Sequence, residues 1–159
     1  MGESQEYAQD LELLLTEMAE LLQATEVNLV ELEKAPKDKS LIQEVFRVMH
    51  TVKGGAATLG LQDAVEVTHR MESLLDGVRS GKREITTKVM DTLFAVMDWL
   101  KEWRRAMSGK ETPPDPHDII AKIDAMGEAD GQEVRHKATG GEDAGLAGAD
   151  LPAALLARA

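Results

Sequence analysis

The chain has 159 residues, a length that suits one compact domain with a short additional segment. It contains no cysteine, which excludes disulfides and thiolate metal sites, and its net charge of −11 argues against a nucleic-acid partner, since phosphate binding needs a basic face. The sequence begins with acidic and polar residues, and glutamates interrupt its longest apolar run, so we predict neither a signal peptide nor a membrane insertion. A cytoplasmic protein is therefore expected.

The first two predicted helices each carry one apolar stripe. The first covers residues 5–34 and ends before Pro36, which cannot continue a helix. Its apolar residues recur at intervals of three and four: Leu11, Leu14, Leu15, Met18, Leu21, Leu22, Leu29 and Leu32. The second begins near residue 40, where Ser40 and Gln43 resemble a capping box, and it ends at Gly60. Its stripe consists of Leu41, Val45, Phe46, Met49, Val52 and Ala56.

The third and fourth predicted helices follow the same pattern. The third covers about 61–79 and stops at the Ser-Gly pair 80–81. Its inward-facing residues are Leu61, Ala64, Val65, Thr68, Met71, Leu75 and Val78. The fourth covers 87–107, and either Thr86 or Thr87 can provide its N-cap. One of its faces carries Val89, Leu93, Val96, Met97, Leu100 and Trp103.

A short fifth helix is expected after the segment TPPDP, which cannot be helical. Asp115 would cap it, with Pro116 as its first residue and Gly127 after its end. The apolar residues that would dock it are Ile119, Ile120, Ile123 and Met126. Residues 1–127 are thus predicted to form an all-α domain, an antiparallel four-helix bundle with a short fifth helix. Residues 128–159 are rich in glycine and alanine, and we expect a flexible tail or interdomain linker.

Two adjacent glycines interrupt the second predicted helix, in the stretch HTVKGG. Together they cost roughly 2 kcal/mol of helix propensity relative to alanine, so a functional reason for them is worth seeking. Lys53 and Gly54 follow His50 at i+3 and i+4 and therefore share its face. Gly54 and Gly55 would leave a flat surface beside the imidazole, on which a partner protein could dock.

A second histidine and a glutamate lie at matching height on the third predicted helix. His50 precedes Gly60 by ten residues, and His69 and Glu72 follow it by nine and twelve. If the two helices pack antiparallel across this turn, these side chains meet. An exposed imidazole can act as a nucleophile, a carboxylate on its other nitrogen fixes the tautomer, and a lysine can stabilise a transferred phosphoryl group. The set suits a histidine that accepts and returns a phosphoryl group.

Other interpretations of the same residues remain open. His50 can be a boundary residue of the apolar stripe, Lys53 a solvated charge, and the paired glycines a device for close helix packing alone. A metal site formed by His50, His69 and Glu72 is disfavoured by the neighbouring Lys53, so we predict no metal. The alternative function is a non-catalytic helical interaction module that uses the Gly54-Gly55 face.

The sequence resembles the histidine phosphotransfer (HPt) domain family. The family pattern is His-x-hydrophobic-Lys-Gly-small, here HTVKGG, and the resemblance extends through FRVMHTVKGGAATLGL and VTHRMESLLDGVRSG. It is strongest to the N-terminal phosphotransfer domain of chemotaxis histidine kinases of the CheA type, and in helix layout it covers about 1–126. Ala57 and Leu59 stand where glycine and phenylalanine are common in the family, which affects packing near the turn.

The resemblance implies a role in a two-component phosphorelay. His50 would accept a phosphoryl group from an ATP-binding histidine kinase domain and pass it to an aspartate of a CheY-like response-regulator receiver domain. Glu72 would accept a hydrogen bond from the second ring nitrogen of His50, and Lys53 and His69 would complete the polar network. The sequence contains no nucleotide-binding motif, so ATP and Mg²⁺ would belong to the partner domains and this chain would need no cofactor. It would be part of an enzyme only within a longer CheA-type kinase.

Overall fold

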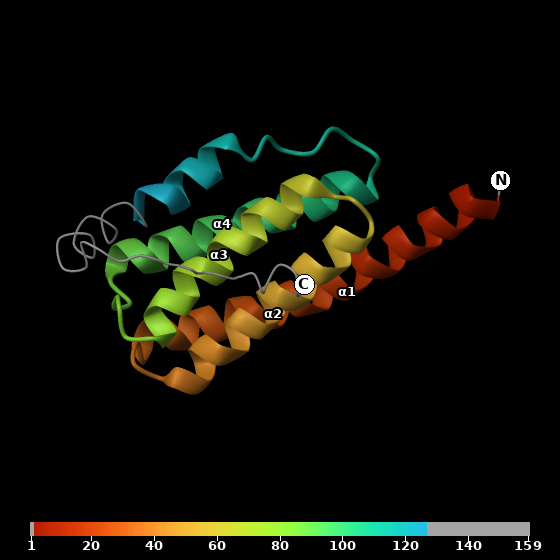
Figure 1. Cartoon of the computed structure of the whole chain (residues 1–159). Helices are drawn as coiled ribbons and strands as arrows, with labels where there is room; N and C mark the ends of the chain where they lie inside the picture. Colours follow the sequence, from red (N-terminus) through yellow and green to blue (C-terminus); the bar gives the residue numbers. More distant parts are fainter. Residues whose placement is uncertain (1, 127–159) are drawn as a thin grey trace. The chain divides into compact units, whose positions relative to one another are not determined.

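The computed structural model describes residues 2–126. Four long helices follow one another in the chain, and their bounds are α1 (Gly2–Lys34), α2 (Lys39–Thr58), α3 (Gln62–Arg79) and α4 (Thr87–Ser108). A short fifth helix covers residues 117–126, and the described part of the chain contains no strand (Figure 1). The predicted tail, 128–159, and the predicted helix stop at Gly127 lie outside the described residues.

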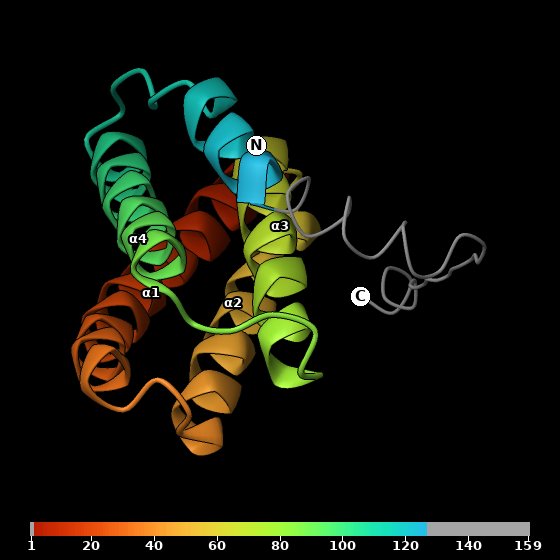
Figure 2. The same cartoon turned by 90° about the vertical axis from the view of Figure 1, so that its left-hand side faces the viewer.

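The four long helices form an antiparallel bundle. α1 packs against α2 and α4, and α3 packs against α2 and α4, so each helix has two neighbours around a common core (Figure 2). The connections 35–38, 59–61 and 80–86 are short, which makes consecutive helices antiparallel neighbours. The all-α bundle predicted from the sequence is confirmed, and α1 begins three residues earlier than expected.

The core is built mainly from the predicted stripes and extends beside them, whereas some stripe residues, such as Phe46 and Leu61, are only half-buried. Its largest fully buried side chains include Met18, Leu22, Leu29, Met49, Met71, Leu75, Leu93, Met97 and Leu100. Ile42, Val48, Val67 and Leu74 are also buried, although they lie beside the predicted stripes. The reason is that each helix contacts two neighbours in the bundle, so its apolar face is broader than one stripe.

The prediction of the N-terminal cap of α2 was wrong. The helix begins at Lys39 and its N-cap is Asp38, whose side chain accepts hydrogen bonds from the backbone N–H groups of Ser40 and Leu41. The Ser40 hydroxyl donates to the same carboxylate, at 2.9 Å. Ser40 therefore lies in the first turn instead of capping it, because the carboxylate two residues earlier binds the free N–H groups of that turn.

The other helix ends follow the predicted signals. Gly60 and Gly81 adopt positive φ angles of 73° and 84°. The N–H of the residue after each glycine donates to a carbonyl five residues back, as in the Schellman motif, which ends α2 and α3 in a tight turn. The Thr86 hydroxyl caps α4 by accepting from the N–H of Val89.

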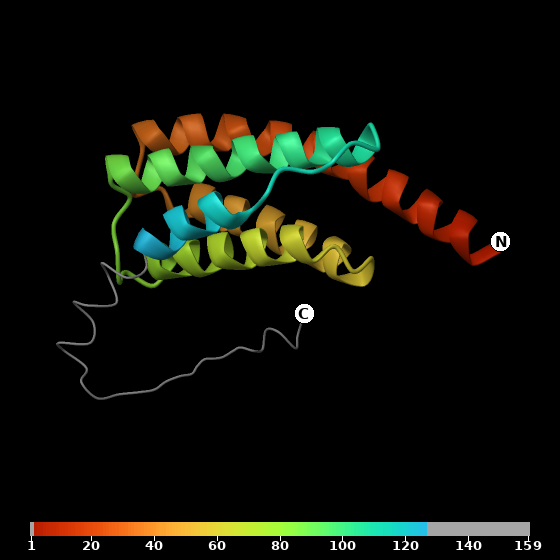
Figure 3. The same cartoon turned by 90° about the horizontal axis from the view of Figure 1, so that it is seen from above.

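The fifth helix begins at His117, one residue later than expected. The Asp115 carboxylate accepts a hydrogen bond from the N–H of His117, and Ile119 and Ile123 are buried. The indole N–H of Trp99 on α4 donates to the Asp115 carbonyl, so this segment lies along the bundle (Figure 3). Within the described residues, no helix combines the length and the apolar character that crossing a membrane requires.

Candidate functional site

His50 and Glu72 meet across the interface between α2 and α3. The Nδ1 atom of His50 lies 2.6 Å from Oε2 of Glu72. The imidazole is about half exposed, at 51%, whereas the Glu72 side chain is 7% exposed. A carboxylate only accepts hydrogen bonds, so Nδ1 is the donor in this contact, and in the neutral ring the lone pair then lies on Nε2. His50 on α2 and Glu72 on α3 thus lie at the same height, as predicted from their distances along the chain to the Gly60 turn.

Lys53 binds the other oxygen of the same carboxylate. Its Nζ lies 2.6 Å from Oε1 of Glu72, and its side chain is only 6% exposed. Lys53 is therefore a buried ion-pair partner instead of a solvated surface charge. Glu72 joins the two side chains of α2 with one oxygen each, and this bidentate arrangement fixes the carboxylate beside the imidazole.

His69 lies near this pair without bonding to it. Its pKa is lowered from its ordinary value, first because the ring is partly desolvated and then because the Lys53 ammonium disfavours its protonated form, while Glu72 acts in the opposite direction. The structure shows no hydrogen bond or ion pair of His69 with any residue among 2–126. A role for His69 in the polar network stays a prediction. Its link to Lys53 and Glu72 is their electrostatic effect on its pKa.

The two glycines have different surroundings. A Cβ atom at Gly54 would meet nothing within 4 Å, so this position opens to the surface beside His50. A Cβ atom at Gly55 would come within 2.7 Å of Cδ1 of Leu14, a buried side chain of α1. Gly55 therefore allows close packing of α1 on α2. The sequence contains no local signal for the Leu14 contact, because it depends on how the two helices are aligned.

The arrangement provides a nucleophile with a fixed tautomer. Glu72 holds the proton on Nδ1 and can stabilise the positive charge that develops on the ring when Nε2 attacks an electrophile. Within residues 2–126, no group of three or more His, Asp or Glu side chains is placed to hold a metal ion. The chemistry that these side chains support is reversible group transfer at Nε2.

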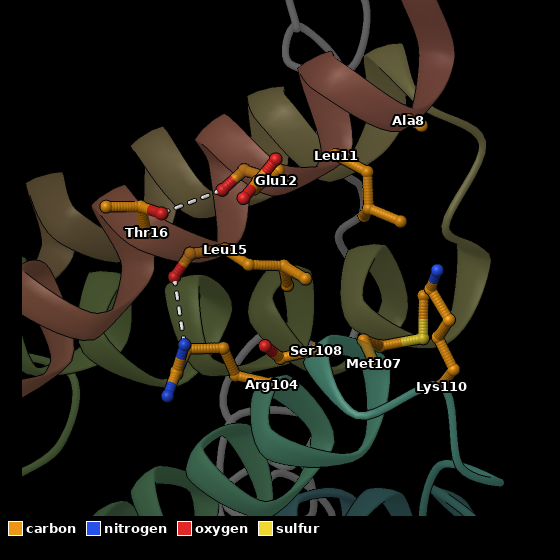
Figure 4. A pocket seen from close by; sticks show the side chains of 9 residues that line it. All are labelled: Ala8, Leu11, Glu12, Leu15, Thr16, Arg104, Met107, Ser108 and Lys110. Carbon is orange, nitrogen blue, oxygen red and sulfur yellow. Dashed lines mark hydrogen bonds between the residues drawn. The ribbon is translucent and has the colours of Figure 1, made fainter. Parts of the chain in front are cut away.

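A separate groove lies between α1 and the end of α4 (Figure 4). It has a volume of about 400 Å³, and its lining includes Leu11, Leu15, Arg104 and Met107. The Arg104 guanidinium donates to the Leu15 carbonyl at 3.3 Å, which joins the two walls. The groove includes none of the predicted site residues, and we assign no role to it.

Comparison with known proteins identifies the family of the chain. The sequence model of the Hpt domain matches residues 9–108, which span the four long helices. The chemotaxis protein CheA of Bacillus subtilis is 36% identical over 120 residues, or 75% of this chain and 18% of that protein. CheA of Listeria monocytogenes is 41% identical over 91 residues, or 57% of this chain and 15% of that protein. The chain thus spans less than a fifth of the length of these relatives.

Solved structures agree with the sequence matches. The CheA phosphotransferase domain from Thermotoga maritima has a TM-score of 0.60 and 36% identity, covering 62% of this chain and 93% of that one. A solution structure of the histidine phosphotransfer domain of CheA has a TM-score of 0.65 and 31% identity, covering 73% and 90%. Fold, site geometry and family match coincide on the same four helices, and the chain belongs to the Hpt family of histidine phosphotransfer domains.

Proposed function

We propose that this chain carries a phosphoryl group on Nε2 of His50 in a chemotaxis two-component phosphorelay. The observation that carries the proposal is the 2.6 Å contact between Nδ1 of the half-exposed His50 ring and the buried Glu72 carboxylate. Membership of the Hpt family and the similarity to CheA proteins support it. The other oxygen of Glu72 is bound by Lys53, so the carboxylate cannot turn away from the ring.

In the first transfer step His50 accepts the phosphoryl group, and in the second step it gives the group up. Nε2 of His50 attacks the γ-phosphorus of ATP held by a histidine kinase domain, so that an N–P bond forms and the bond to the ADP oxygen breaks. The ring becomes positively charged, and Glu72 stabilises it through Nδ1–H. An aspartate carboxylate of a receiver domain then attacks the phosphorus, the N–P bond breaks, and its electron pair returns to Nε2.

The partners supply what this chain lacks for the complete relay. ATP with its Mg²⁺ would be bound by a kinase catalytic domain, in the same or a separate chain, and the receiver would hold its own Mg²⁺. We expect the receiver to be CheY-like, because the relatives are chemotaxis proteins. A cytoplasmic location and a chain without a cofactor of its own belong to the same proposal.

The alternative of a non-catalytic interaction module has less support. It relies on Gly54 and Gly55 as one docking face, whereas Gly55 is covered by Leu14 of α1. It also gives no role to a buried Lys53–Glu72 pair, which costs desolvation energy and needs a compensating reason.

The test is phosphorylation of the chain by a CheA-type kinase domain with labelled ATP. The parent protein should give an acid-labile, base-stable phosphoprotein, and His50→Gln should reduce the label to background. His117→Gln is a matched control, since this histidine is exposed and outside the site, and it should keep the parent's label. Full labelling of His50→Gln would refute the proposal.

A further inference from the structure

The lysine that follows His50 by one turn of α2 is already bound by Glu72. Nζ of Lys53 lies 2.6 Å from Oε1 of the carboxylate, and the Lys53 side chain is only 6% exposed. If Lys53 left this partner, a buried carboxylate would lose its counter-ion, which is strongly unfavourable. A phosphoryl group on Nε2 also forms at the ring nitrogen that does not contact Glu72. Lys53 therefore holds the carboxylate and leaves the phosphoryl group without a cation of its own.

Arg47 is the exposed cation of α2 that lies closest to His50 along the helix. The other exposed cation of α2, Lys39, lies about three turns before His50. Arg47 precedes His50 by one turn on the same face, and its side chain is 62% exposed. Side chains on a helix lean toward its N-terminus, so the His50 ring leans toward the turn that contains Arg47. A change of rotamer can therefore bring the guanidinium to a group bound at Nε2.

The present partner of Arg47 holds it only weakly. Nη2 of Arg47 lies 3.2 Å from Oε1 of Glu44, three residues earlier, and both side chains are at least half exposed. Exposed pairs of this kind contribute little to stability, because water solvates each charge well when the pair is broken. The contact also shows that the Arg47 side chain spans one helical turn, which is its separation from His50 in the other direction.

The cations of the facing helix α3 have more extensive contacts. The guanidinium of Arg79 donates to the Asp76 carboxylate at 2.7 Å and to the Gln43 side chain at 3.1 Å. Arg70 pairs with Asp124 of the fifth helix at 2.5 Å. α3 contains no other Lys or Arg, so the weakly held guanidinium of α2 is the cation that can turn to the imidazole.

From this arrangement we infer that Arg47 binds the phosphoryl group on His50 and releases Glu44 when it does so. The inference rests on the proposed function, because it concerns the phosphorylated state. A phosphoryl group carries about two negative charges at pH 7, and a guanidinium can donate two parallel N–H groups to two of its oxygens. Glu44 has one charge and accepts one hydrogen bond from Arg47. Charge and geometry both favour the exchange, which forms and breaks no covalent bond.

The pKa of the phosphoryl group provides the test. A positive charge within about 4–6 Å favours the ionised form of an acid, so a bound guanidinium should lower the pKa of the phosphoryl group. Each protein is phosphorylated with phosphoramidate, which avoids the kinase, and its phosphorus NMR signal is followed as the pH is changed. The signal of phosphorylated His50 is identified as the one that His50→Gln removes.

Substitution of Arg47 should change this pKa. Arg47→Gln should raise the pKa of the phosphoryl group by about one pH unit, which is tenfold in the acid constant. Arg47→Lys should recover part of that change, because lysine keeps the charge without the planar fork. Arg105→Gln is the matched control, since it removes the same charge from an exposed ion pair on α4, the helix opposite α2. It should keep the parental pKa.

Glu44→Gln tests the exchange of partners. It frees Arg47 in advance, so the pKa of the phosphoryl group should fall below the parental value. The fall should be smaller when Glu44→Gln is made in the Arg47→Gln background, which has no guanidinium to release. An unchanged pKa in Arg47→Gln, or an equal rise in Arg105→Gln, would overturn the inference. Failure of the proposed function would look different, because the parent would then give no signal that His50→Gln removes.

Discussion

At the scale of single residues, the site depends on one carboxylate with two partners. Glu72 is almost fully buried and binds both the His50 ring and the Lys53 ammonium, each at 2.6 Å. The His50 contact serves the chemistry, while the Lys53 contact compensates two buried charges. These two contributions can be separated, because stability depends on the pair and phosphorylation depends on the carboxylate.

Glu72→Gln should therefore destabilise the protein by about 3 kcal/mol, because Lys53 keeps a buried charge without a counter-ion. Replacing both residues, in Lys53→Met/Glu72→Met, removes the charges together and should recover most of that loss. Urea unfolding measures both values. Phosphorylation should be slowed strongly in both variants, since Gln lacks the negative charge that stabilises the positively charged ring and Met cannot accept a hydrogen bond from Nδ1. A double variant that regains the parental rate would contradict the role of Glu72 in orienting the ring.

His69 gives a pH-dependent prediction. The pKa of His69 is lowered by desolvation and by Lys53, so the unfolded chain binds its proton at higher pH than the folded one. The contribution of His69 to stability is therefore present above the unfolded pKa of about 6.5. It decreases as the pH falls below that value. An NMR titration should place the His69 midpoint below 6.5, and Lys53→Met should move it upward. A midpoint unchanged by Lys53→Met would exclude the effect of the Lys53 charge on His69.

At the scale of helices, the two adjacent glycines should respond differently to alanine. Gly54→Ala places a methyl group in open space and should stabilise the protein by about 0.5–1 kcal/mol through helix propensity. Gly55→Ala should lose that gain or destabilise, because its methyl group meets Leu14 on α1. Thermal unfolding of the two variants compares them directly. Equal stabilisation by both would show that α1 packs less closely on α2 than described.

The helices also show what the sequence can and cannot predict. Their number and approximate limits follow from local signals, such as Pro36, Thr86, and the glycines 60 and 81, because these residues act on their own backbone. The Asp38 cap was missed because two polar residues competed for one role within three positions. The burial of Lys53 and the Leu14 contact at Gly55 depend on how separate helices align, which no local pattern contains.

At the scale of the whole molecule, the excess of negative charge should act mainly through α1. The net charge is −11, and seven exposed carboxylates of α1 lack ion-pair partners among the described residues. Repulsion among such charges destabilises the compact state and is screened by salt. Raising NaCl from about 10 to 200 mM, a range over which the Debye length falls several-fold, should therefore increase the free energy of unfolding.

The double variant Glu17→Gln/Glu20→Gln tests where that repulsion originates. The two residues lie one helical turn apart, and Gln has a helix propensity close to that of Glu, so removing both charges should stabilise the protein by about 0.5 kcal/mol at low salt. It should also weaken the response to NaCl. Glu102→Gln is the contrasting variant, because Glu102 pairs with Arg105 at 2.6 Å and its loss should bring no gain. If all three substitutions changed stability alike, the repulsion would belong to net charge alone and not to the unpaired carboxylates of α1.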